Sequence, residues 1–190
     1  MSRTNSGGSS LTDIIGVSPV VKLDGGTPSV WAFPELSGTQ AFKAGEMVCL
    51  SGGAGNAVGL TRPPVDASGF GILGFAADDA SGTTSAKKGV YIATPDTVFI
   101  GNVGHATSAS AQTAATDLGQ LYGLTSLSGR TYVDKGKTSL STVMARVIGL
   151  YEDDNVPCFY GRVYFSVIQP ACQLYNSKTW NTSSRADLLQ

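Results

Sequence analysis

Short apolar runs, broken by glycine and small polar residues, recur along most of the chain, and this pattern is typical of many short β-strands joined by turns. The clearest runs are 143–150 and 161–168. In the second run, apolar side chains at 163, 165 and 167 alternate with more polar ones at 162, 164 and 166, which predicts a half-buried sheet strand. The pattern predicts strands at 19–23, 30–33, 46–50, 70–76, 89–92, 97–100, 120–124, 130–133, 143–150 and 161–168.

One segment, Ala111 to Leu118, predicts a short helix. It consists largely of small residues, follows Ser108 and Ser110 as candidate N-caps, and ends before Gly119 as a candidate C-cap. Strands and helix together predict an all-β fold, a single β-barrel or β-sandwich-like domain with one short helix and extended N- and C-terminal arms.

Two turns are predicted between neighbouring strands. The sequence Leu127-Ser128-Gly129-Arg130 has the residues of a tight turn, so we expect a β-hairpin between 121–124 and 131–133. The glycine-rich stretch 51–59 lacks the third glycine of a dinucleotide-binding fingerprint. We therefore interpret it as a turn that joins 47–50 to 57–60.

The chain divides into an N-terminal arm (1–18), a β-rich domain (19–170) and a C-terminal tail (171–190). Residues 1–12 are rich in Ser, Gly, Thr and Asn and contain too little apolar surface to fold alone. We expect both ends to contact another chain. The candidate partner-contact residues are Leu11, Leu174, Tyr175 and Trp180.

Composition narrows the classes of partner. Charged residues make up 14% of the chain against about 25% in ordinary soluble domains. The net charge is −1, from 13 basic and 14 acidic residues, so no broad cationic surface is available for nucleic acid. The N-terminus has no apolar signal region and no run approaches the ~20 apolar residues of a membrane span. We expect a soluble protein made in a cytoplasm, with no nucleic-acid or membrane partner.

Residues that could carry chemistry form no familiar catalytic or metal-binding set. Three cysteines cannot all pair within one chain, and their spacing fits neither a disulfide framework nor structural zinc. His105 is the single histidine and lies in a Gly, Ala, Thr and Ser stretch typical of a connector. Residues 136–138 end like a phosphate-binding loop, but Thr131 stands where its first glycine belongs. No catalytic, cofactor-binding or metal-binding residues are predicted.

Two similar segments, 72–79 and 147–154, each end in a pair of acids, Asp78 with Asp79 and Asp153 with Asp154. Adjacent acids on a strand point to opposite faces, so each pair supplies at most one carboxylate to a pocket. We interpret the acids as turn residues whose side chains accept backbone N–H groups. Aromatic residues within the apolar runs, Trp31 among them, are expected in the core or in a subunit contact.

Four segments resemble the small β-rich decoration, or cement, proteins of tailed-bacteriophage heads. They are 41–48 (AFKAGEMV), 71–76 (GILGFA), 117–124 (DLGQLYGL) with 132–134 (YVD), and 161–165 (GRVYF). The resemblance spans about residues 41 to 168 and carries no catalytic residues with it.

This resemblance implies a structural virion protein on the outer capsid surface. It would bind the major capsid protein, bridge neighbouring subunits, form homo-oligomers with trimers favoured, and act neither as an enzyme nor with a cofactor. Extended arms could add strands to a neighbour's sheet. Two alternatives stay open: a head-fibre base or glycan-binding host-surface adhesin, and a hydrolase that would need His105 beside a serine or carboxylate in a cleft.

Overall fold

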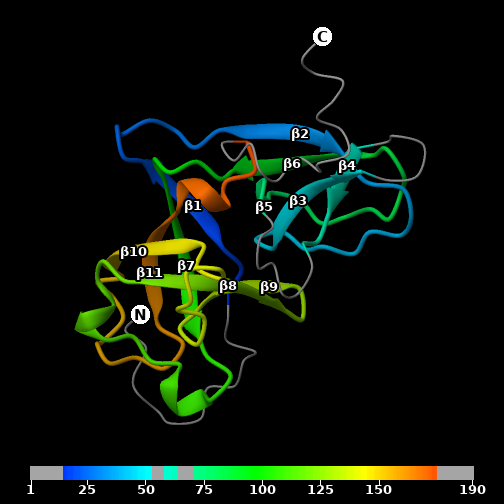
Figure 1. Cartoon of the computed structure of the whole chain (residues 1–190). Helices are drawn as coiled ribbons and strands as arrows, with labels where there is room; N and C mark the ends of the chain where they lie inside the picture. The colour runs from blue at the N-terminus through cyan, green and yellow to red at the C-terminus, as the bar shows by residue number, and fades with distance from the viewer. Residues whose placement is uncertain (1–14, 53–57, 64–70, 175–190) are drawn as a thin grey trace.

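The computed structural model describes residues 15–52, 58–63 and 71–174, and β-strands dominate this part of the chain (Figure 1). These residues form eleven strands, and their helical segments are short 3-10 turns, η3 (Ser108–Ser110), η4 (Ala115–Asp117) and η5 (Gln169–Ala171). The predicted all-β fold is confirmed.

The first sheet has six strands in the order β1-β7-β11-β10-β8-β9. Five of them close into a barrel, because β9 also pairs in parallel with β7 at Val103 and Val133. β1 pairs with β7 outside this closed set and forms the sheet's edge. These strands are β1 (Ser18–Lys22), β7 (Thr97–Gly104), β8 (Leu121–Leu127), β9 (Arg130–Asp134), β10 (Ala145–Leu150) and β11 (Arg162–Val167).

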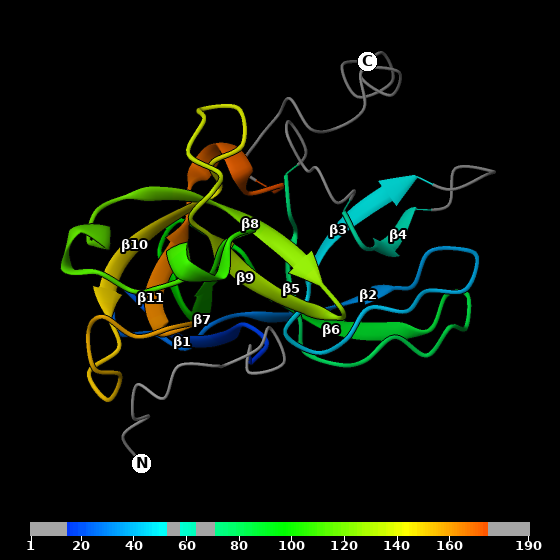
Figure 2. The same ribbon diagram turned by 90° about the horizontal axis from the view of Figure 1, so that it is seen from below.

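The second sheet has five strands in the order β2-β6-β5-β3-β4 and lies beside the barrel (Figure 2). Its two ends approach each other, since Glu35 and Leu60 form a parallel bridge just beyond β2. These strands are β2 (Val30–Pro34), β3 (Met47–Gly52), β4 (Val58–Thr61), β5 (Gly74–Ala76) and β6 (Lys87–Ile92).

The two larger hydrophobic cores of the described residues are separated by β3 and β5. Met47 and Phe75 pack into the barrel core, whereas their neighbours Val48 and Ala76 pack into the core of the second sheet. Successive residues of a strand point to opposite faces, so these two strands contribute to both cores. In the barrel core, the rings of Phe75 and Phe99 lie 4.7 Å apart between centroids.

The predicted hairpin and the predicted turn between 47–50 and 57–60 are both confirmed. β8 and β9 pair antiparallel around Ser128 and Gly129, whose φ angles of 52° and 78° fit a tight hairpin turn. β3 and β4 also pair antiparallel, while the connecting residues 53–57 lie outside the described residues. The alternation in β11 holds at its apolar positions, because Val163, Phe165 and Val167 are buried.

The predicted helix from Ala111 to Leu118 is wrong. The first residues of this segment pair with 158–160 instead: the Tyr160 N–H donates to the Ala111 carbonyl (2.7 Å) and the Thr113 N–H to the Cys158 carbonyl (2.9 Å). Only Ala115–Asp117 forms a 3-10 turn. Burial of Ala111 and Thr113 against a distant strand end overrides the weak helix preference of a short segment.

Buried polar contacts join the barrel to the second sheet. The Met47 N–H of β3 donates to the hydroxyl oxygen of Thr131 in β9 (2.8 Å). Behind η5, the Gln173 side chain accepts from the Leu50 N–H (2.8 Å) and donates to the Leu50 carbonyl (2.7 Å). The side chains of Thr131 and Gln173 are both buried, and the Thr131 bond is fully shielded from water.

Candidate interaction surface

Of the four partner-contact residues predicted from the sequence, the structure describes one. Leu174 is 39% exposed and directly follows Gln173, whose amide is bonded to β3. Leu11, Tyr175 and Trp180 lie outside the described residues. Leu174 is thus an apolar side chain at the surface on an anchored backbone.

Exposed apolar side chains are concentrated at the start of the described chain. Eleven large apolar residues of the described part are exposed, and five of them fall between residues 15 and 31. We call residues 15–34 the N-terminal ribbon. It contains β1 and β2, which are edge strands of the two different sheets. The five residues are Ile15, Val20, Leu23, Val30 and Trp31.

The backbone of the ribbon is firmly held. The Ile15 N–H donates to the side-chain oxygen of the buried Asn102 (2.8 Å). The Val17 N–H donates to the Gly45 carbonyl (3.0 Å) and the Leu23 N–H to the Asp96 carbonyl (2.8 Å). The exposed side chains therefore start from a fixed backbone, which lowers the entropy lost on binding.

The open side of β1 carries features that hinder the addition of another strand. Pro19 has no N–H to donate, and the register with β7 shifts between Pro19 and Val21, which places a bulge at Val20. β4, an end strand of the second sheet, is covered, because the Leu36 N–H donates to the Leu60 carbonyl (3.0 Å). The backbone of Leu36 also packs against Gly59.

β2 differs from these two edges. The Ile92 N–H donates to the Ser29 carbonyl, and the Glu35 N–H donates to the Ala86 carbonyl, so odd-numbered residues of this segment bond to β6. The N–H and C=O groups of Val30 and Ala32 consequently point away from β6. No strand of the described residues pairs with β2 on that side at these two positions, and β2 lies at the upper border of the second sheet in Figure 1.

Trp31 lies on β2 beside this open edge and is 56% exposed. Its ring stacks on Phe33, with centroids 6.4 Å apart and planes 24° from parallel. Phe33 packs against the second core, so one aromatic ring anchors the next. Trp31, which the sequence predicts in the core or in a subunit contact, lies at the surface.

Glu35, immediately after β2, fixes the end of this strand. Its buried carboxylate accepts the Ser81 N–H (2.6 Å), the Ser81 hydroxyl (2.7 Å) and the Gly82 N–H (3.0 Å), and Lys88 lies 3.9 Å away. Burial alone would raise the pKa of this carboxyl. The hydrogen bonds from Ser81 and Gly82, with the Lys88 charge, outweigh burial and hold the pKa below its ordinary value.

Leu140 is a second exposed apolar feature, 90% exposed on the loop before β10. This loop is internally bonded: the Thr142 and Val143 N–H groups both donate to the Ser139 carbonyl, at 2.8 and 2.9 Å. Leu140 therefore projects from an ordered turn.

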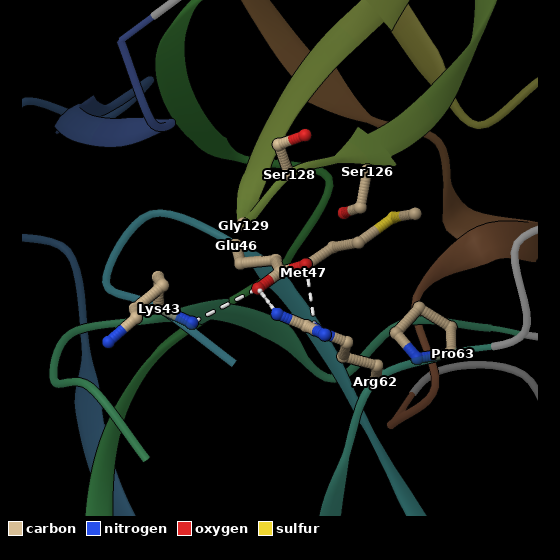
Figure 3. A pocket seen from close by; sticks show the side chains of 8 residues that line it. All are labelled: Lys43, Glu46, Met47, Arg62, Pro63, Ser126, Ser128 and Gly129. Atoms are coloured by element: carbon tan, nitrogen blue, oxygen red, sulfur yellow. Dashed lines mark hydrogen bonds and ion pairs between the residues drawn. The ribbon is translucent and has the colours of Figure 1, made fainter. Parts of the chain in front are cut away.

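A shallow cavity of about 300 Å³ lies between the β8–β9 hairpin and the second sheet (Figure 3). Its one buried carboxylate, Glu46, is fully engaged: Arg62 contacts both oxygens at 2.9 and 3.0 Å, and the Lys43 N–H donates to it at 3.0 Å. This arrangement ties the segment before β3 to the residue that follows β4. The cavity is lined by Lys43, Glu46, Met47, Arg62, Pro63, Ser126, Ser128 and Gly129.

The interpretation of the acid pairs as backbone acceptors is confirmed for three of the four residues. Asp78 accepts the Gly89 N–H (2.9 Å), Asp79 the Ala44 N–H (2.9 Å) and Asp154 the Arg162 N–H (2.6 Å). These carboxylates shape turns and strand ends, which agrees with the turn chemistry of aspartate.

The ring of His105 is engaged locally. Its Nδ1 accepts the Thr107 N–H (2.9 Å), and the ring packs against Gly136. Within the described ranges, no group of three or more His, Cys, Asp or Glu side chains is arranged to hold a metal ion. None of the helical turns in these ranges has the length and apolar content of a membrane span.

Sequence reasoning missed the exposed edge of β2, although a signal was present. Pro28 and Pro34 flank the apolar stretch, and proline is confined to edge positions of sheets. A strand enclosed by two prolines could therefore have been assigned to an edge, and Trp31 with it.

Comparisons with known proteins give no further guidance. No family model, no curated protein and no solved structure matches this chain.

Proposed function

We propose that this protein is a structural virion protein that binds the outer surface of a phage capsid and stabilises the shell by bridging neighbouring major capsid subunits. The observation that carries the proposal is the N-terminal ribbon, with five exposed apolar side chains on or next to two sheet-edge strands. The resemblance of residues 41–168 to capsid decoration proteins supports the same role. The protein would act without catalysis and as a homo-oligomer.

The ribbon is suited to binding a protein surface. Fully burying a large aliphatic side chain contributes about 1.5–3 kcal/mol, and Ile15 and Leu23 are 52% and 66% exposed, so each has about half of that to gain. Modest contacts suffice on a capsid, because a copy that bridges two subunits gains effective concentration at the second contact.

The test measures binding to capsids of the phage that encodes this chain, assembled without it. We expect Val20→Asp and Leu23→Asp each to raise the dissociation constant for the capsid by about tenfold or more, because each places a charge in an apolar contact. The matched control is Leu118→Asp, at a residue that is 58% exposed and outside the ribbon. Binding of the wild-type chain at a fixed number per lattice site would support the role. Equal binding by the ribbon variants and the control would refute the docking surface, and no binding by the wild-type chain would refute the function.

The terminal arms can be tested in the same assay. We expect chains that lack residues 1–12 or 176–190 to attach more weakly while their thermal unfolding stays unchanged. Capsids that bind both truncated chains as well as the full chain would exclude the arms from the interface and leave the ribbon.

A further inference from the structure

We propose that two copies of this chain pair through their β2 strands, antiparallel and centred on Trp31, so that the two second sheets continue across a two-fold axis. The proposal does not rest on the capsid role. It starts from the open side of β2, where the N–H and C=O groups of Val30 and Ala32 point outward. Such an edge is a template for another strand.

The edge is complementary to itself. With Trp31 opposite Trp31 of the second copy, Val30 stands opposite Ala32 of the second copy. By the two-fold symmetry, Ala32 stands opposite Val30 of the second copy. Each of these two pairs has outward N–H and C=O groups, so each can form two ladder hydrogen bonds. Pro28 and Pro34 lie three residues on either side of Trp31. Beyond Pro34 the outward side of the strand is already bonded to β4 of the same chain, since the Leu36 N–H donates to the Leu60 carbonyl, so the added strand pairs only between the two prolines.

The side chains also match in this register. Directly opposite residues in an antiparallel pair lie on the same face, so the two Trp31 rings meet and each is backed by its own stacked Phe33. On the other face Val30 meets Ala32. The aromatic contact would cover ring surface that is 56% exposed in the single chain.

Charge does not oppose the pairing. The segment 28–34 (PSVWAFP) contains no charged residue. Edge strands that must stay single commonly carry lysine, a proline within the strand or a bulge, and β1 carries all three. β2 has its prolines only at the ends of the exposed stretch, which limits the length of an added strand without blocking it.

The first experiment is light scattering with size-exclusion chromatography over a concentration series into the high-micromolar range. We expect a monomer–dimer equilibrium for the wild-type chain. Trp31→Lys should raise the dimer dissociation constant by about 30-fold or more, because the substitution removes the central aromatic contact and brings two like charges together. Leu140→Lys, at a residue 90% exposed elsewhere, should leave it unchanged. Thermal unfolding of each variant reports whether the fold is intact.

The second experiment tests the register and keeps Trp31. Val30→Cys and Ala32→Cys chains are mixed and oxidised mildly; the native cysteines are buried. Opposite residues of a hydrogen-bonded pair have Cα atoms about 5.5 Å apart, within disulfide range, whereas diagonal residues lie about 7–8 Å apart. We expect the mixture to cross-link rapidly and each variant alone only slowly. A wild-type chain that is monomeric throughout, or a trimer whose mixed cysteines do not cross-link, would overturn the proposal.

Discussion

Replacing Glu35 by glutamine tests how the end of β2 is held. The carboxylate is buried, accepts three hydrogen bonds from Ser81 and Gly82, and lies 3.9 Å from Lys88. Glutamine keeps the shape, but its NH₂ group must face one of these donors. Hydrogen bonds to charged groups contribute about 1.5–3 kcal/mol each. We therefore expect the free energy of unfolding at neutral pH to fall by about 2–4 kcal/mol.

The same change alters the pH dependence of stability. Because the folded-state pKa of Glu35 lies below its ordinary value of 4.5, its contribution is complete above that pH and is lost as pH falls through the folded-state pKa. The gap between wild type and Glu35→Gln should therefore narrow as the pH falls below 4.5.

The assay is urea unfolding at a series of pH values, with Glu152→Gln as the control at an exposed carboxylate. For a chain of 190 residues, a loss of 2–4 kcal/mol lowers the melting temperature by roughly 4–16 °C. A gap that stays constant from neutral to acidic pH, or no gap at all, would refute the assignment of this carboxylate as an ionised anchor.

Two further predictions concern the buried contacts. Thr131→Val removes the acceptor of the Met47 N–H at constant size, and we expect the free energy of unfolding in urea to fall by about 1–3 kcal/mol. Thr131→Ser keeps the hydroxyl and should lose less stability. An equal loss in both variants would contradict the role of the bond. A thiol reagent at pH 8 should modify none of the cysteines in the folded chain and all three in urea. The reason is burial, which raises the pKa of Cys49 to about 11 and that of Cys172 to about 12. Rapid labelling of the folded chain would contradict this prediction. The three buried cysteines are Cys49, Cys158 and Cys172.

The sequence predicted those elements whose signal is local. The alternation in β11 and the turn at Ser128 and Gly129 are properties of a few consecutive residues, and both elements formed where expected. The segment from Ala111 to Leu118 has a local signal as well, but its backbone is bonded to residues about 45 positions away. A short segment with little helix preference takes the conformation that its distant partner imposes.

The division into two cores was not visible in the sequence, because it depends on which strands face both sides. Met47-Val48 and Phe75-Ala76 read as plain apolar runs, and such runs do not reveal that alternate residues serve different cores. The candidate surface was less visible for a related reason. The apolar pattern around Trp31 is the same in a central strand as in an edge strand, so only the flanking Pro28 and Pro34 indicate an edge.

The contrast between β1 and β2 assigns separate uses to the two halves of the N-terminal ribbon. β1 presents Val20 on a bulge next to Pro19, so its open side offers side chains but few backbone groups, and a partner there must bind through apolar contact. β2 offers backbone groups at Val30 and Ala32 and an aromatic ring between them. Under the proposed capsid role, a capsid surface would bind the first half and a second copy the second half. A paired protein would then present two β1 surfaces to the shell, which would increase its effective concentration at neighbouring subunits.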